Sequence, residues 1–192
     1  PSLTPTLSLQ PSVTPTKTIQ PIRTLTPYPP TGSSGTLTKI NLNPIADAMV
    51  DERRPDMNFG RRPVLEVDGV FAKQVFMKFD ISSLVGKQIK SAKLTVRVAN
   101  FPSVSQNIRF VDDSSWIEDK ITYNTRPATG DLLGKITGTG FGRYTSSNLN
   151  INNISTEDKY LSIEIDSPDK HAFHFFGKDS NFSPQLILEY VK

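Results

Sequence analysis

Basic side chains on three expected strands have the types and the spacing to bind an anionic ligand. In QVFMKFD, alternation with period two leaves Phe76 and Lys78 outward. The same alternation turns Lys93, Arg97 and Arg109 outward on the strands that follow. If these strands are neighbours, the five side chains share one face. On that face the basic groups can bind carboxylates of a ligand, and the ring of Phe76 can stack against a sugar. We therefore expect a face that suits an acidic glycan, with a rim formed by Arg61 and Arg62.

The same residues also fit an ordinary solvent-facing sheet. Lysines and arginines on exposed strand faces keep proteins soluble and discourage pairing of sheet edges. Because a shift of one residue in register moves every side chain to the other face, the sequence leaves both interpretations open.

The only tryptophan of the chain, Trp116, lies in the polar segment SSWIEDKITYNTRPATG. In one interpretation its exposed indole stacks on a sugar ring, assisted by Tyr123 or Arg126. In the other, Trp116 and Ile117 close one end of a β-sandwich, while polar side chains satisfy the backbone of an irregular connection. The second is favoured, because a single tryptophan with no other aromatic at strand spacing is a poor stacking platform. The bracing side chains would be Glu118, Thr122, Tyr123, Asn124 and Arg126.

Acidic side chains in two loops are weak candidates for a structural calcium site. Asp51 and Asp56 lie in DERRPDMNFGRRP, and Asp112 and Asp113 are adjacent in a second loop. Calcium requires several oxygen ligands, but the spacing does not match an EF-hand and four arginines share the first loop. Asn58-Phe59-Gly60 reads more simply as a turn. No cofactor is required by the sequence.

Catalysis has little support in the sequence. The only histidines, His171 and His174, lie on one expected strand and face opposite sides. The chain has no nucleophile elbow, no HExxH motif and no glycine-rich phosphate loop. We therefore expect a protein that is not an enzyme.

The composition excludes several classes of partner. Residues 37–192 carry 20 basic and 19 acidic groups, so the basic pI of the whole chain is not the mark of a nucleic-acid-binding domain. No stretch approaches the ~18 consecutive apolar residues that span a bilayer. Cysteine is absent, which removes disulfides and thiol chemistry. A monomer without nucleic-acid partner or membrane insertion is expected.

The first 36 residues differ from the rest and predict a linker. They contain eight of the 15 prolines and a degenerate ten-residue repeat that begins PSLTPTLSLQ and PSVTPTKTIQ. Proline-rich segments behave as semi-rigid extended spacers. Residues 1–36 are therefore expected to tether the domain of residues 37–192 to an upstream domain of the same polypeptide, as in secreted and surface proteins of polysaccharide-degrading bacteria.

The remaining residues predict short strands without helices. Leu94, Val96 and Val98 alternate with polar residues, which is typical of a half-buried antiparallel strand. Many such strands predict an all-β fold, a two-sheet antiparallel β-sandwich of jelly-roll type. The expected strands are 37–42, 45–50, 63–68, 73–81, 88–99, 106–112, 132–137, 148–153, 160–166, 171–178 and 184–191.

Successive blocks over residues 45–191 resemble the DNRLRE, or disaggregatase-related, domain, which is similar to the alginate-binding family of carbohydrate-binding modules. They include VFMKFDISSL, IKSAKLTVRV and FFGKDSNFSPQLILEY, and the most specific block runs from Trp116 to Pro127. The Arg-Glu pair usual before the last strand is Lys178-Asp179 here, which removes a planar arginine fork.

The resemblance implies a jelly-roll accessory module of secreted polysaccharide-active enzymes, or a component of cell-surface proteins. It further implies an acidic polysaccharide ligand that is met by basic residues. We therefore expect a non-catalytic, extracellular carbohydrate-binding module that holds an attached catalytic or sensing domain near alginate or a pectin-like polyuronate. The alternative is a structural or adhesive surface module with no glycan ligand.

Overall fold

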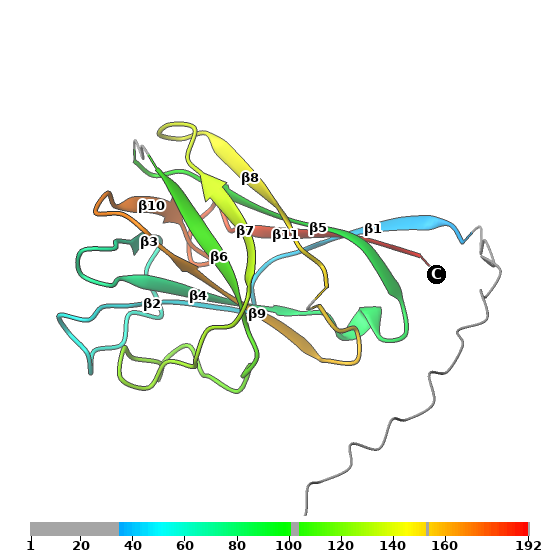
Figure 1. Cartoon of the computed structure of the whole chain (residues 1–192), viewed down its shortest axis with the longest axis horizontal. Helices are drawn as coiled ribbons and strands as arrows, with labels where there is room; N and C mark the ends of the chain where they lie inside the picture. The colour runs from blue at the N-terminus through cyan, green and yellow to red at the C-terminus, as the bar shows by residue number, and fades with distance from the viewer. Residues whose placement is uncertain (1–34, 101–103, 153, 192) are drawn as a thin grey trace, which may run out of the picture. The chain divides into compact units, whose positions relative to one another are not determined.

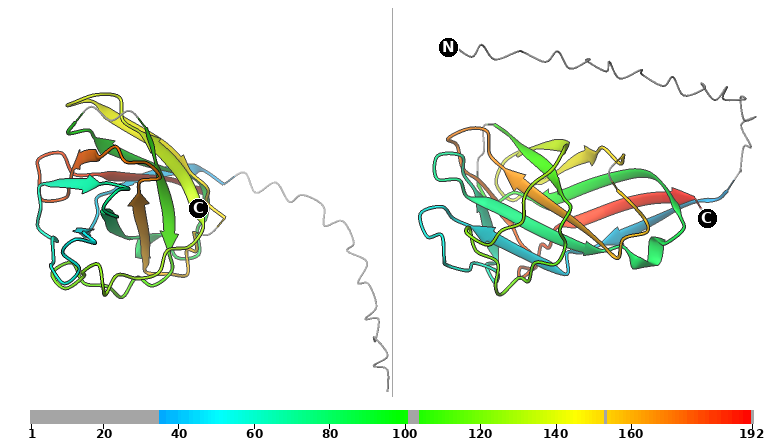
Figure 2. Two further views of the ribbon diagram at one scale, coloured as in Figure 1. Left: turned by 60° about the vertical axis from the view of Figure 1, so that its left-hand side comes forward. Right: turned by 60° about the horizontal axis from the view of Figure 1, so that its bottom comes forward.

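The computed structural model describes residues 35–100, 104–152 and 154–191. The predicted linker, residues 1–36, lies outside these residues except for its last two. The described chain is all-β, with two larger antiparallel sheets packed face to face as a β-sandwich (Figures 1 and 2). The one helix in this part is a 3-10 turn at Ser82–Leu84, and no described helix is long and apolar enough to cross a membrane.

Eleven strands build the sandwich. The four-stranded sheet has the order β1 (Leu37–Leu42), β11 (Gln185–Val191), β5 (Gln88–Arg97) and β8 (Tyr144–Leu149). The five-stranded sheet has the order β2 (Ala46–Val50), β4 (Gln74–Asp80), β9 (Tyr160–Asp166), β6 (Ser105–Val111) and β7 (Leu132–Thr137). A two-stranded ribbon pairs β3 (Val64–Val67) with β10 (Phe173–Phe176). Most successive strands change sheet, with β6 and β7 the exception, and the predicted β-sandwich fold class is confirmed.

Period-two alternation explains which side chains form the core. Leu94 and Val96 of β5 point inward and meet Met77 of β4 and Ile163 of β9, and all four are fully buried. The intervening residues of β5 and β8 point away from the core and are partly or fully exposed. This alternation gives each large sheet an outer face, and the two outer faces differ in how they are covered.

The predicted strands agree with the observed ones except at β8. The sequence predicted a strand at 148–153, whereas β8 covers Tyr144–Leu149. Its inward residues include Thr145 and Ser147, which are buried but polar, so the hydrophobic alternation is weak there. The strand starts directly after a turn that contains Gly140 and Gly142, both with positive φ, where other residues are strained.

Candidate functional site

The outer face of the four-stranded sheet, here called the open face, is turned to solvent. Along β8 the exposed residues alternate strictly with buried ones, and pairing with β5 places Arg97 opposite Tyr144 and Lys93 opposite Asn148. On the other side of β5, β11 places Ile187 opposite Lys93. The open face comprises the outward side chains Lys39, Asn41, Ser91, Lys93, Thr95, Arg97, Tyr144, Ser146, Asn148, Gln185, Ile187 and Glu189.

Arg97 is held in place on the open face by aromatic rings. Its guanidinium carbon lies 3.6 Å from the ring centroid of Phe182 and 5.9 Å from that of Tyr144. Its Nε donates a hydrogen bond to the carbonyl of Gly142 at 2.9 Å. Its two Nη groups have no hydrogen-bond partner among the described residues. The stacking therefore orients the guanidinium and leaves donors for a ligand.

A hollow of about 430 Å³ opens beside Phe182, the ring on which Arg97 stacks. The exposed ring of Tyr144, 58% accessible, forms part of its wall. Its other lining residues are Asn43, Thr95, Asn181, Phe182, Ser183 and Gln185. Because amides and hydroxyls surround one accessible ring, the hollow can both stack against a sugar ring and hydrogen-bond to its hydroxyl groups.

The charge of the open face is positive. Lys39, Lys93 and Arg97 outnumber Glu189 on these strands. Neither Lys39 nor Lys93 has an ion-pair partner within the described ranges, and Glu189 accepts a hydrogen bond from Ser91 at 2.8 Å. Unpaired ammonium groups beside an oriented guanidinium can attract and bind carboxylates.

The outer face of the five-stranded sheet is covered instead. The segment 112–131 lies across it, and its Trp116 and Ile121 pack on Phe76 and Ala48. Phe76 is fully buried, so the predicted aromatic platform is wrong. Lys78 is only 8% exposed, and burial lowers its pKa despite the attraction of Asp113.

Trp116 is anchored by the sheet beneath it. Its indole is 7% exposed and meets the Phe76 ring edge-on, with the centroids 6.3 Å apart. Its Nε1 donates a hydrogen bond to the Ser162 hydroxyl at 3.2 Å, and its carbonyl accepts one from the Lys78 ammonium. The indole therefore offers little surface for stacking on a ligand, although two hollows of about 290 and 400 Å³ adjoin the segment.

The polar residues after Trp116 hold the segment to its neighbours. Asn124 donates from its amide to Asp56 at 2.8 Å, and Arg126 lies 3.6 Å over the ring of Tyr123. Thr122 and Thr125 exchange hydrogen bonds within the segment. Every one of these contacts is internal to the fold, which is the geometry expected of bracing side chains.

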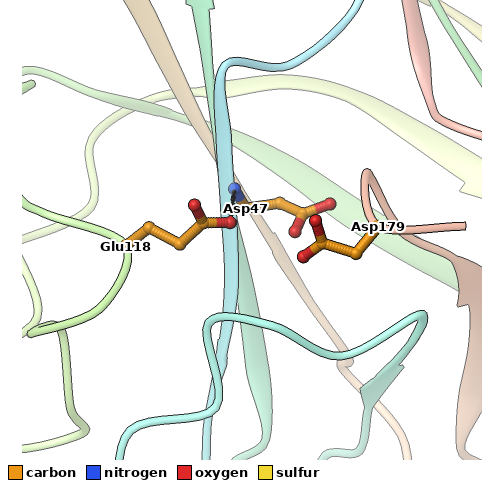
Figure 3. Close-up of side chains that lie close together, drawn as sticks. All are labelled: Asp47, Glu118 and Asp179. Atoms are coloured by element: carbon orange, nitrogen blue, oxygen red, sulfur yellow. Dashed lines mark hydrogen bonds between the residues drawn. The ribbon is translucent and has the colours of Figure 1, made fainter.

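Three carboxylates that the sequence did not group together lie close to one another where this segment meets β2. One carboxylate oxygen from each of Asp47, Glu118 and Asp179 lies within 4.8 Å of the other two (Figure 3). Lys178 places its ammonium 3.0 Å from Glu118 and 3.0 Å from Asp179. Burial raises the pKa of Asp47 to about 7. Burial alone would lower the pKa of Lys178, but its bonds to Glu118 and Asp179 raise it.

The predicted calcium ligands are occupied by other contacts. Asp51 is buried and pairs with Arg54 at 3.1 Å, and Asp56 accepts from Asn124. Asp113 caps the backbone of Ser115 at 2.8 Å. Within the described residues, these aspartates and Asp112 do not form a group of three or more close acidic ligands.

Comparison with known proteins gives the class of the domain. The model of carbohydrate-binding module family 96 matches residues 38–190, nearly the whole described chain. The chain belongs to carbohydrate-binding module family 96. Such modules are non-catalytic, so the prediction of a non-enzymatic carbohydrate-binding module is confirmed. The finer resemblance to the DNRLRE domain and to alginate-binding modules stays a prediction.

A curated relative places a similar sequence inside a much larger enzyme. A gellan lyase from Bacillus sp is 29% identical over 108 residues, which cover 53% of this chain and 4% of the relative. The family 96 module thus corresponds to a small fraction of that protein's length.

The predicted basic face of the family 96 module does not exist as one surface. Lys93 and Arg97 lie on β5 in the four-stranded sheet, whereas Lys78 and Arg109 lie on β4 and β6 in the other sheet. Arg109 is also paired with Asp166 at 2.6 Å. The expected grouping fails because the strands alternate between the two sheets.

The predicted rim residues are held in the loop between β2 and β3. Arg61 makes a two-pronged contact with Asp119, with distances of 2.9 and 2.6 Å. The Arg62 guanidinium carbon lies 5.3 Å from the ring centroid of Phe59. Both guanidiniums therefore have partners within the protein.

Residues that the sequence analysis missed complete the open face. Tyr144 fell outside the predicted strand, and Phe182 lies in a loop far along the chain. A strand placed at 144–149 would have put Tyr144 on the outward side together with Ser146. No sequence signal pairs Phe182 with Arg97, because that contact depends on the docking of the loop after β10.

Proposed function

We propose that this module binds an acidic polysaccharide on the open face and holds an attached catalytic or sensing domain close to it. Tyr144 stacks against one sugar ring, and Lys93 and Arg97 bind the carboxylates of neighbouring sugar units of the polysaccharide. The observation that carries the proposal is the uncovered sheet face, on which the unpaired Lys93 lies on the same strand as the oriented Arg97, next to the exposed Tyr144.

Family membership, a similar protein and the proline-rich segment support this role. Membership of a carbohydrate-binding family supports a glycan ligand, and the relative named as a gellan lyase supports attachment to a polysaccharide-active protein. The proline-rich residues 1–36 would tether the module to an upstream domain, which raises the effective concentration of that domain at the polymer. A protein of this type acts outside the cell.

Alanine at Lys93 or Tyr144 is expected to weaken binding to alginate or polygalacturonate about tenfold, the equivalent of ~1.4 kcal/mol. Lys93 supplies a charge-assisted contact and Tyr144 a stacking surface, and both are outward residues with few internal contacts. The measurement is affinity electrophoresis of the full chain in gels that contain alginate, polygalacturonate, gellan, xylan or a neutral glucan, at two salt concentrations.

Lys135→Ala is the matched control, because it removes the same charge from an exposed position on β7 of the other sheet. Retardation by the uronates that is weakened by salt, by Lys93→Ala and by Tyr144→Ala, but not by the control, is the expected result. Retardation that both open-face variants retain would place the site elsewhere. No retardation by any polymer would instead favour a structural module without a glycan ligand.

A further inference from the structure

We propose that Asp47, Glu118 and Asp179 form a binding site for a divalent cation of the calcium class, which competes with the ammonium group of Lys178. The site is separate from the open face and does not depend on the glycan that the module binds. Figure 3 shows the carboxylate of Asp47 beside that of Asp179, with the carboxylate of Glu118 reaching toward the backbone of Asp47.

The first support is an unsatisfied buried acceptor. Asp47 has no exposed surface, and its Oδ1 has no hydrogen-bond partner among the residues that the structure describes, whereas its Oδ2 accepts the backbone N–H of Lys178 at 2.5 Å. A buried carboxylate oxygen without a donor is costly, so such atoms usually have a partner. A cation among the three carboxylates would supply that partner.

The second support is an excess of negative charge. When all three carboxyl groups are ionised they face one ammonium, which leaves two formal negative charges unbalanced inside the cluster, whereas burial favours the neutral form of Asp47. Arg61 lies nearby, but its guanidinium is bound by Asp119 at 2.6 Å. A divalent ion in place of the ammonium would balance the cluster more fully.

The donor set and its spacing select the class of ion. The three side chains offer only oxygen, which suits hard cations and disfavours metals that prefer nitrogen or sulfur. Calcium binds oxygens at about 2.3–2.6 Å, so two ligands on opposite sides of the ion lie roughly 4.6–5.2 Å apart. The spread of up to 4.8 Å fits that span. Magnesium, with bonds of about 2.0–2.1 Å, spans only about 4.0–4.2 Å between opposite ligands, which is less than the outer limit of this spread.

The ammonium group of Lys178 competes with a cation for the three carboxylates. Its ammonium now bridges Glu118 and Asp179, and its side chain is 22% exposed, so it has a path to solvent. An entering ion would displace it and join three separate elements: β2, the segment 112–131 and the loop after β10. That loop also contains Phe182, so the ion would fix the residue on which Arg97 stacks.

The test uses Trp116, which is two residues from Glu118 in the chain and is the only tryptophan. Terbium is titrated into the full chain after EDTA treatment, with excitation selective for tryptophan, and calcium or magnesium is then added to displace it. We expect saturable terbium emission that calcium removes at about tenfold lower concentration than magnesium. Calcium should also raise the melting temperature of the protein.

Lys178→Met is expected to bind terbium and calcium about tenfold more tightly, because the competing cation is removed. Asp179→Asn, at a position whose side chain is partly exposed, is expected to weaken binding by about the same factor. Circular dichroism checks that both variants are folded. The proposal is overturned if neither wild type nor Lys178→Met gives saturable emission, or if emission is unchanged in Asp179→Asn, which would place the ion elsewhere.

Discussion

Replacing Trp116 with alanine is expected to lower the free energy of unfolding by about 3–5 kcal/mol. The indole is 7% exposed and fills the contact between segment 112–131 and the five-stranded sheet. Its removal leaves a cavity over Phe76, and it also uncovers the ammonium of Lys78, which lies 4.5 Å from the ring. Chemical denaturation followed by circular dichroism measures the loss.

Two further variants make this result specific. Trp116→Phe keeps most of the buried ring but loses the hydrogen bond to Ser162, so a loss of about 1–2 kcal/mol is expected. Tyr144→Ala, at an exposed aromatic of the other sheet, should change stability by less than about 0.5 kcal/mol.

The Trp116→Ala variant also distinguishes a structural role of Trp116 from direct contact of its indole with the ligand. At a temperature where Trp116→Ala is folded, it should bind polysaccharide as tightly as the wild type, because the open face belongs to the other sheet. Weaker binding together with unchanged stability would contradict the structural role and would place the ligand on the hollows beside the segment.

The sequence predicted the fold well because the fold rests on local alternation. Leu94 and Val96 alternate with Lys93, Thr95 and Arg97, and the structure turns the first group to the core and the second to solvent. This pattern does not depend on which strands are neighbours, since the alternation within one strand is enough to show which of its residues face the core. Where buried positions are small and polar, as in β8, the same signal becomes weak and the strand was misplaced.

The site could not be predicted to the same extent, because sites depend on which strands are neighbours. Phe76 does point away from the central core, as the alternation implied, yet Trp116 of a distant segment covers it. Lys78 and Lys93 both point outward, but from different sheets. The side of a strand on which a residue lies is a local property. Whether another segment covers that residue, and to which sheet its strand belongs, depend on tertiary structure and cannot be predicted from the sequence of one strand.

The carboxylate cluster illustrates the same limit. Asp47, Glu118 and Asp179 are separated by more than 60 positions from one to the next, and none of them belongs to a local pattern of metal ligands. Gly60 and Gly177 help to bring them together, because a Cβ at Gly60 would lie 2.3 Å from the Glu118 carbonyl and one at Gly177 would lie 3.0 Å from Asp47. Close backbone approaches of this kind cannot be read from spacing.

Glu164→Gln is expected to stabilise the module at pH 8 by up to about 3 kcal/mol, and to have little effect near pH 4. Glu164 lies on β9 with no exposed surface, and within the described part of the chain neither of its buried carboxylate oxygens has a hydrogen bond of good geometry. Burial, with a further contribution from Asp166, raises its pKa from 4.5 to about 7, against the attraction of Arg109 and Arg126 and the influence of the Thr129 hydroxyl. Glutamine has nearly the same shape and carries no charge.

The direction of the change in stability follows from the pKa of Glu164 in the unfolded chain and its pKa in the folded protein. Below about pH 4.5 the carboxyl is protonated in both the folded and the unfolded chain, so it contributes no charge penalty. As the pH rises from 4.5 to about 7, the unfolded chain loses this proton first, and the stability of the folded protein falls. Above about pH 7 both states are ionised and the loss stays constant, at about 3 kcal/mol for a shift of this size.

The measurement is the difference in the free energy of unfolding between Glu164→Gln and the wild type, from denaturant titrations at several pH values between 4 and 8 and at fixed ionic strength. Asp47 also has a raised pKa, but it is present in both proteins and cancels in the difference. The difference should grow in favour of the variant through pH 4.5–7 and then level off. A flat difference would show that Glu164 is ionised in the fold at all these pH values, with Arg109 and Arg126 offsetting its burial.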